Sequence, residues 1–199
     1  MSNDDTRPTF YINQQPVRAA GLLIWCRYQG EIYVLLTRYN YKEYQNLWAD
    51  LGGKTEIGDT DPLHTAIREC SEETNCCLVS NKTPESKHHV RSLMHRSNKF
   101  LKKQYHTKTT PIYVPQSKYM IYPIELPNSK RTIENFGEIE YHTGYEREIK
   151  WWSLTEIKTL QESNHLHFRL RDPRINQSIL KSLPSKTPSK IPKETPKNL

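Results

Sequence analysis

The stretch Gly52-Gly53-Lys54-Thr55-Glu56-Ile57-Gly58-Asp59, which leads toward Ile67-Arg68-Glu69-Cys70-Ser71-Glu72-Glu73-Thr74-Asn75, decides how the rest of this sequence is interpreted. Residues three and four apart share one face of a helix, so Glu69, Glu72 and Glu73 are predicted to project together. A separate apolar stripe comprises Leu63, Ala66, Ile67 and Cys70. The pattern predicts a helix that packs through one side and concentrates negative charge on another.

The acidic face of this predicted helix needs a positive partner. Like charges three and four residues apart on a helix each cost roughly 0.2–0.5 kcal/mol. Clustered carboxylates without a lysine on the same face suit a hard divalent cation such as Mg2+, which prefers oxygen ligands. A solvated acidic face is the alternative explanation, because helix faces are routinely charged. The glycine-containing loop before the helix favours the metal.

The segment resembles the Nudix box, whose family pattern is G-x5-E-x7-R-E-U-x-E-E-x-G-U, with U a bulky apolar residue. The matching positions are Gly53, Arg68, Glu69, Cys70, Glu72, Glu73 and Cys76. The sequence departs from the pattern in three ways: Asp59 replaces the first glutamate, eight residues rather than seven separate it from Arg68, and Asn75 replaces the last glycine. All three helix carboxylates are kept.

The departures are compatible with the same local structure. Asn tolerates the left-handed backbone conformation almost as well as Gly, so Asn75 is predicted to end the helix. The extra residue lies beside Asp61-Pro62, where Asp can cap a helix and Pro can open it. A loop at that point absorbs one more residue easily.

The resemblance implies an α+β fold, namely a Nudix-type α/β/α sandwich with a mixed β-sheet and a loop-helix-loop catalytic motif. It also implies a metal-dependent hydrolase that uses Mg2+ or Mn2+. Such an enzyme cleaves the pyrophosphate linkage of a nucleoside diphosphate that is linked to another moiety. The resemblance extends from about Val17 to Leu160.

Candidate site residues follow from the same resemblance. The predicted metal ligands are Glu69, Glu72, Glu73 and the backbone carbonyl of Gly53. The predicted catalytic residues are these glutamates with Arg68, which is expected to brace the loop through Asp59 or Glu56, and with Glu148 or Glu146 as a general base outside the box. The predicted substrate-binding residues are Gly52, Gly53, Lys54 and Arg38.

Length and composition indicate one domain with tails. The 199 residues divide into a flexible N-terminal arm at 1–15, a Nudix domain at 16–183 and a disordered basic Ser/Thr/Pro/Lys tail at 184–199. No apolar run approaches the roughly 20 residues that span a bilayer, and the N-terminus is unlike a signal peptide. We therefore expect an intracellular, cytoplasmic protein with no membrane partner. The four cysteines are predicted to be reduced and buried.

Positive charge points to an anionic partner. The net charge is +7, of which the last 19 residues carry +4 through five lysines and one glutamate, leaving +3 for the rest. A second basic stretch, 87–108, is interleaved with Phe100 and Tyr105, and its secondary structure is not predicted. A solvated surface is the default explanation of both segments, and RNA binding is the alternative.

Further elements are expected on both sides of the box. The strands Val17–Cys26 and Glu31–Arg38 are predicted to form a hairpin around Gln29-Gly30. More strands are predicted at 77–79, 110–114, 118–124 and 145–152. Short helices are predicted after the capping box that starts at Ser153, and from Pro173 to Leu183.

The box defines the bond and leaves the substrate open. A damaged nucleoside triphosphate, a nucleotide sugar, a dinucleoside polyphosphate and capped RNA, which would make the protein a decapping enzyme, all remain candidates as the phosphorylated nucleotide substrate. The alternative function is a catalytically inactive Nudix-fold module that binds or senses RNA or a nucleotide. Such modules lack a box carboxylate, and all three carboxylates are present here.

Overall fold

A mixed β-sheet forms the centre of the computed structural model, which describes residues 6–40, 46–80, 84–105, 110–127, 136–175 and 177. The six strands are β3 (Ala19–Tyr28), β4 (Glu31–Tyr39), β5 (Leu51–Lys54), β6 (Ile112–Val114), β7 (Tyr119–Glu125) and β8 (Arg147–Ser153). Their order is β6-β7-β3-β4-β8, with β5 beside the first half of β3. Strands β3 and β7 run parallel, whereas all other pairs are antiparallel.

The predicted β3–β4 hairpin is confirmed. Tyr28 pairs with Glu31, so only two residues connect the strands. Both of them, Gln29 (φ 51°) and Gly30 (φ 85°), have positive φ. This is the backbone of the mirror-image turn that matches the twist of the flanking strands.

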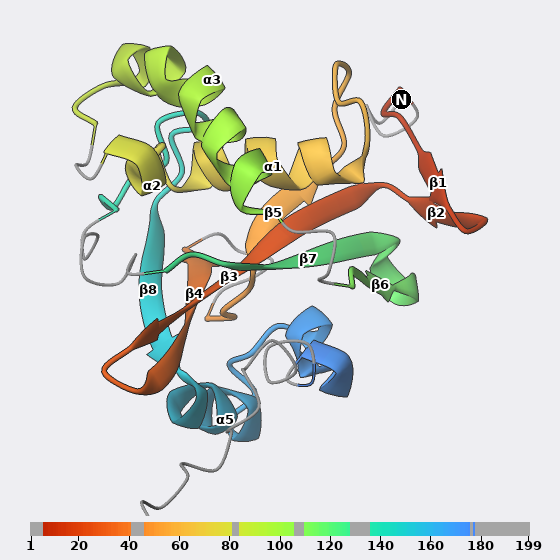
Figure 1. Ribbon diagram of the computed structural model, residues 1–199, viewed down its shortest axis with the longest axis vertical. Coiled ribbons are helices and arrows are strands. Elements are labelled where there is room, and N and C mark those ends of the chain that lie inside the picture. The colour runs from red at the N-terminus through yellow and green to blue at the C-terminus, as the bar shows by residue number, and fades with distance from the viewer. Residues whose placement is uncertain are drawn as a thin grey trace, which may run out of the picture.

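Helices cover both faces of the sheet (Figure 1). One face carries α1 (Pro62–Glu73), α2 (Cys77–Ser80) and α3 (Lys87–Gln104), and the other carries α5 (Leu154–Glu162) and the short 3-10 helix η2 (Phe168–Arg171). Strand β3 supplies both cores, because alternate side chains point to opposite faces. Leu22 and Ile24 belong to the α1 side, Leu23 and Trp25 to the α5 side. The predicted α/β/α sandwich is therefore confirmed.

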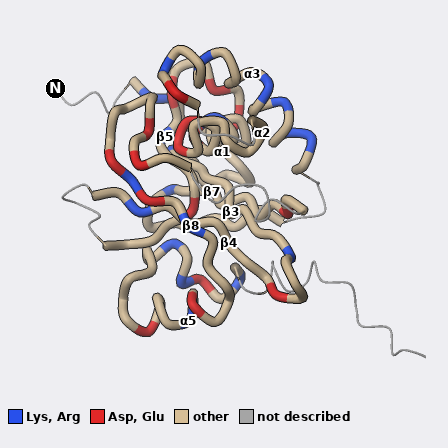
Figure 2. The backbone as a smooth tube through the Cα atoms, turned by 90° about the vertical axis from the view of Figure 1, so that its left-hand side faces the viewer, with Lys and Arg blue, Asp and Glu red and all other residues tan. Residues whose placement is uncertain are grey.

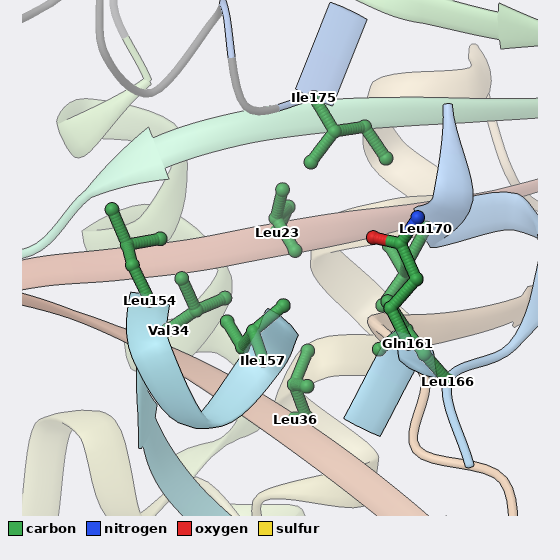
Figure 3. A pocket seen from close by; sticks show the side chains of 9 residues that line it. All are labelled: Leu23, Val34, Leu36, Leu154, Ile157, Gln161, Leu166, Leu170 and Ile175. Carbon is green, nitrogen blue, oxygen red and sulfur yellow. The ribbon is translucent and has the colours of Figure 1, made fainter. Parts of the chain in front are cut away.

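A small cavity lies in the core between the sheet and α5 (Figure 3). Its volume is about 20 Å³, which is room for about one water molecule. Leu23, Val34 and Leu36 from the sheet face Leu154 and Ile157 of α5 across it. An apolar space of this size is a packing feature and is too small for a nucleotide.

Several elements differ from the sequence prediction. Residues 77–79 form part of α2 and not a strand, because the chain turns after α1 and re-enters a helical conformation. The basic stretch forms α3 over most of its length, and Phe10–Ile12 (β1) pairs with Gln15–Val17 (β2) in a hairpin that the sequence analysis did not anticipate. A further 3-10 helix, η1, covers Pro115–Ser117.

Other predictions are confirmed or fall outside the described residues. Ser153 caps α5 with the reciprocal bonds of a capping box, and all four cysteines are buried thiols. Helical backbone begins at Pro173, but most of the helix predicted to end at Leu183 and the whole tail at 184–199 lie outside the described residues. The same holds for 1–5 of the arm and 106–108 of the basic stretch. Among the described helices, none is long and apolar enough to cross a membrane.

Candidate active site

Helix α1 is fixed at both ends by its own sequence. Asp61 caps the N-terminus by accepting a hydrogen bond from the His64 backbone N–H at 2.7 Å, and Pro62 occupies the first turn. At the other end, Asn75 has a φ of 50°. The Cys76 N–H donates to the Ser71 carbonyl and the Asn75 N–H to the Glu72 carbonyl, which is the Schellman arrangement. The predicted caps at Asp61 and Asn75 are confirmed.

The paired glycines bring strand β5 against the acidic side of α1. A Cβ on Gly53 would lie 2.5 Å from the Glu69 carboxylate carbon, so only glycine allows this approach. A Cβ on Gly52 would lie 2.3 Å from the Gly21 Cα on the neighbouring strand. The two glycines therefore place the backbone of β5 directly beside the Glu69 carboxylate.

Arg68 connects the loop before α1 to the helix carboxylates. Its Nε lies 3.0 Å from Asp59, and its Nη2 donates to the Lys54 carbonyl at 3.0 Å. This confirms the predicted brace, and Asp59 keeps its role despite the extra residue. Arg68 also reaches the acidic face, where its Nη1 lies 3.1 Å from Glu69 and 3.0 Å from Glu72. Arg68 therefore contacts the carboxylate face of α1 as well as the loop before it.

Glu73 forms a buried cluster with two residues from other elements. The Tyr39 hydroxyl at the end of β4 lies 2.8 Å from Glu73 Oε1 and 2.9 Å from Glu140 Oε2. One hydroxyl has one proton to donate, so a neutral carboxyl must supply a second proton if both contacts are hydrogen bonds. The other oxygen of Glu73, Oε2, is buried without a hydrogen-bond partner among the described residues.

Burial favours the protonated form of the three box carboxyls, Glu69, Glu72 and Glu73, in the metal-free protein. Desolvation raises the pKa of Glu69 to about 8, although the nearby Arg68 guanidinium opposes the shift. Desolvation, with the charges of Glu69 and Glu140, raises the pKa of Glu73 well above its ordinary value. The pKa of Glu72 is also raised by burial. A cluster with several raised acid pKa values lacks the positive charge that a bound cation would supply.

The loop at 136–146 is tied to the end of α1 by two side chains. Asn75 donates to the Ile139 carbonyl at 2.8 Å and accepts from the Tyr141 N–H at 2.9 Å. Arg147 is buried, donates to the Glu73 carbonyl at 2.8 Å, and reaches the Gly137 and Phe136 carbonyls from the same guanidinium. Both contacts position Glu140 near Glu73. The asparagine that replaces the family glycine therefore acquires contacts that glycine cannot make.

The structure brings some of the predicted site residues together and separates others. Glu69, Glu72 and Arg68 meet around the β5 backbone, with Glu73 on the same helix face. Glu148 lies on the opposite face of the sheet, because its neighbour Arg147 points toward α1 and side chains alternate along a strand. There Glu148 pairs with Arg38, at 2.5 Å.

The remaining predicted residues are less closely held. Lys54 is exposed at the end of β5, and Glu146 is exposed next to the buried Arg147. Arg38 lies 5.0 Å above the Trp48 ring, and Trp48 is buried in the second core. Sequence reasoning missed Tyr39 and Glu140. The acidic run before β8 was the only available signal for Glu140, and no local pattern marks Tyr39.

The donor chemistry of the site fits a divalent cation. Glu69, Glu72 and Glu73 offer carboxylate oxygens, Glu73 Oε2 is an unpartnered buried acceptor, and the backbone of Gly53 adjoins Glu69. Within the described residues, however, no three acidic, histidine or cysteine side chains stand close enough to hold one ion together. Arg68 forms ion pairs with Glu69 and Glu72, and a bound metal ion would share these carboxylate oxygens with it.

Fold and site together define an α/β/α sandwich in which a helix with three carboxylates follows a strand with paired glycines. The family model for the NUDIX domain matches residues 15–171, and the chain therefore belongs to the Nudix family. Members of this family generally use divalent metals such as Mg2+ or Mn2+.

Individual relatives are distant. An uncharacterized protein of Acanthamoeba polyphaga mimivirus is 25% identical over 216 residues, covering 90% of this chain and 70% of that protein. A crystal structure of a C. elegans Ap4A hydrolase binary complex matches with a TM-score of 0.50 at 19% identity, covering 84% of this chain and 99% of that one. The NUDIX domain of Shewanella oneidensis NrtR complexed with ADP ribose matches with a TM-score of 0.46 at 14% identity, covering 83% of this chain and 87% of that one. The match to the Ap4A hydrolase structure shows the fold.

Substituting Asn75 by glycine, the family residue, tests the loop attachment. We expect Asn75→Gly to keep the helix end, since glycine adopts positive φ freely, but to lower kcat about tenfold as the loop carrying Glu140 loosens. Asn164→Gly is the matched control, because Asn164 also has positive φ (59°) and is exposed. Steady-state kinetics should separate the two variants. Parental kcat in Asn75→Gly would show that these contacts do not position the site.

Proposed function

We propose that this protein hydrolyses the pyrophosphate linkage of a nucleoside diphosphate linked to another moiety, with Mg2+ or Mn2+ as the cofactor. The observation that carries the proposal is the buried cluster of Glu73, Tyr39 and Glu140, beside Glu69 and Glu72. Burial and the neighbouring carboxylates raise the pKa of Glu73 in this cluster. Buried carboxyls of this kind are costly to ionise without a positive partner, and strongly shifted pKa values are typical of functional sites. Family membership supports the reaction class.

The carboxylates Glu69, Glu72 and Glu73, with the Gly53 carbonyl, are the proposed metal ligands. A divalent ion held there would neutralise the diphosphate and lower the pKa of a bound water. Arg68 fixes the 54–59 loop to the helix, so the β5 backbone stays beside Glu69. The exposed Lys54 at the end of that strand is the proposed contact for a substrate phosphate.

Glu140 is the acid outside the box that lies beside Glu73. Its oxygen shares the Tyr39 hydroxyl with Glu73, so it can take up or release a proton at that hydroxyl. We therefore add Glu140 to Glu148 and Glu146 as candidate general bases. Glu148 remains a candidate only for a substrate that reaches the Arg38 face of the sheet, where it lies.

A substrate screen with identified products tests the function. The purified chain would be incubated with Mg2+ or Mn2+ and, separately, a dinucleoside polyphosphate, a nucleotide sugar, nucleoside triphosphates and capped RNA. Release of a nucleoside phosphate from at least one of them, abolished by chelation, is the expected result. Binding of a phosphorylated ligand with no hydrolysis of any of these would instead identify the inactive, ligand-sensing alternative.

Metal affinity should depend strongly on pH. Glu69, with a pKa raised to about 8, is mostly protonated at pH 7 without metal, and the pKa of Glu73 is shifted in the same direction, so ligation should release protons. We expect the apparent affinity to rise about tenfold per pH unit for each proton released between pH 6 and 8. Isothermal titration in buffers of different ionisation enthalpy would count these protons. An affinity independent of pH over this range would contradict the protonated site.

The same pKa shift predicts how the metal-free fold responds to pH. A carboxyl whose pKa is raised in the folded state stabilises the fold only while it is protonated. For Glu69 this contribution is complete below the unfolded value of 4.5 and is lost as pH rises through about 8. Urea unfolding at several pH values would follow the loss, and Glu69→Gln should flatten this part of the profile.

A further inference from the structure

Helix α3 carries a positive surface that the proposed hydrolysis does not use. Its 18 residues contain six lysines and arginines, three histidines and no acidic residue. Lys87 donates to the His142 carbonyl at 2.8 Å. Within the described part of the chain, the other cations make no ion pair with an acidic side chain; they are Arg91, Arg96, Lys99, Lys102 and Lys103. Figure 2 shows this concentration of basic residues along α3.

The cations follow one side of the helix. Lys87, Arg91, His95 and Lys99 are four residues apart, so they form a row with a spacing of about 6 Å in which three of the four side chains are cations. The buried positions Val90, Ser97 and Leu101 lie on another side, against the rest of the fold. Like charges at this spacing repel each other on an isolated helix, at roughly 0.2–0.5 kcal/mol per pair. A ligand with regularly spaced negative charges would offset that repulsion.

A pocket of about 450 Å³ opens between this row and α1. It is lined by Thr60, Asp61, Leu63, His64, Ile67, His95, Asn98, Lys99 and Lys102. Leu63 and Ile67 give it an apolar side, while Lys99 and Lys102 give it positive charge. Asp61 brings a negative charge as well, but its carboxylate is engaged by the His64 backbone N–H and the Thr60 hydroxyl.

His64 is oriented as a hydrogen-bond donor in this pocket. Its Nδ1 accepts a hydrogen bond from the Thr60 backbone N–H at 3.1 Å. The neutral imidazole therefore carries its proton on Nε2. The pocket combines a neutral donor and two ammonium groups with an apolar wall, a set that suits a phosphate joined to a weakly polar ring.

The pocket lies on the far side of α1 from the candidate catalytic carboxylates. Ser71 contacts Ser97 of α3 at 2.8 Å, and on a helical wheel Ser71 and Ile67 fall roughly opposite Glu69. A helix with its side chains is about 10–12 Å across. A small nucleotide bound in the pocket would therefore not place its diphosphate at Glu69, whereas an extended ligand can occupy both places.

We infer that α3 and the α1–α3 pocket bind the backbone of a single-stranded nucleic acid, with phosphates along the row of cations and a base against Leu63 and Ile67. A strand with phosphates along one side and bases along the other matches a row of basic side chains on α3 beside an apolar wall on α1. An anionic membrane fits less well, because the large exposed hydrophobic side chains of the described residues all lie outside α3. The inference concerns a second surface and holds whether or not the carboxylates hydrolyse a nucleotide.

The test compares two double variants of the full chain. Lys99→Gln/Lys102→Gln removes two cations from the pocket, and Lys118→Gln/Lys158→Gln removes two exposed cations elsewhere as the matched control. Fluorescence anisotropy would measure binding of a labelled, uncapped 15-nucleotide single-stranded RNA without divalent metal, from 50 to 300 mM salt. The basic tail is the same in all three proteins, so the difference reports α3.

We expect the α3 variant to bind about tenfold more weakly at low salt, and its plot of log affinity against log salt to be shallower by about 1.4, since each phosphate contact on a single strand contributes about 0.7. The control should retain the parental slope. Equal slopes in both variants would overturn the inference. It would also be overturned if the α3 variant lost binding to phosphatidylserine vesicles but bound RNA as the parent does. Both variants should hydrolyse a small dinucleoside polyphosphate at the same rate. A negative result in the RNA-binding test therefore leaves the proposed function standing.

Discussion

Glu73→Gln is expected to lower kcat by about 100-fold or more while leaving the protein folded. The glutamine side chain has no negative charge with which to bind a cation, and its amide cannot exchange a proton with the Tyr39 hydroxyl. It does match the size and hydrogen-bonding capacity of the neutral carboxyl that burial favours in the metal-free state. Thermal unfolding without metal should therefore be almost unchanged, and single-turnover and steady-state kinetics should show the loss.

The matched control for this variant is Glu162→Gln at the exposed end of α5. Among the described residues, Glu162 makes one weak ion pair, with Lys158 at 3.9 Å, and its helix α5 lies on the opposite side of the sheet from α1. It should keep full activity and metal affinity. If Glu73→Gln retained parental turnover on a substrate that the wild-type chain hydrolyses, the carboxylate mechanism would be wrong. If both variants were inactive, the loss would not report the site.

Local sequence predicted those parts of the site that depend on one segment. The caps at Asp61 and Asn75, the brace between Arg68 and Asp59 and the close approach at Gly53 all involve residues near one another in the chain. Their geometry follows from backbone preference and side-chain length. The three helix glutamates share a face for the same reason. In the structure, Arg68 forms ion pairs with two of them, Glu69 and Glu72.

The rest of the site depends on tertiary pairing. Tyr39 of β4 meets Glu73 of α1 because the helix packs against the sheet, and Glu140 joins them because Asn75 and Arg147 hold its loop. Glu148 was predicted from its place in the chain before the tryptophan pair. The alternation of side chains along β8 decides its direction, and one residue of register separates the two faces of a sheet.

Residues 77–79, predicted as a strand, show that a short apolar run does not determine secondary structure. Cys77-Leu78-Val79 is apolar and partly β-branched, and three residues do not distinguish a strand from a buried helical turn. The left-handed residues Asn75 and Cys76 reverse the chain, and the Cys77 N–H then bonds the Thr74 carbonyl. The run therefore becomes α2.

Asp50→Ala is expected to destabilise the fold by about 3–5 kcal/mol, because it leaves a buried cation unpaired. Asp50 is almost fully buried, lies 3.2 Å from the Arg169 guanidinium and accepts from the Tyr119 hydroxyl at 2.8 Å. Arg169 also lies 4.0 Å above the Tyr119 ring. Equilibrium urea unfolding would measure the change, which should appear in the midpoint with an unaltered slope.

The double variant Asp50→Ala/Arg169→Met separates the cost of an unpaired charge from the cost of lost packing. With both charges removed, at least half of the lost stability should return, since an apolar pair of similar volume often replaces a buried ion pair without penalty. The Tyr119 hydroxyl still loses its acceptor, which prevents complete recovery. This network adjoins the glycine strand, because a Cβ on Gly52 would lie 2.3 Å from the Tyr119 oxygen. If the double variant were no more stable than Asp50→Ala, Asp50 would act by holding β5 and not by neutralising Arg169. In that case the activity of both variants should fall together.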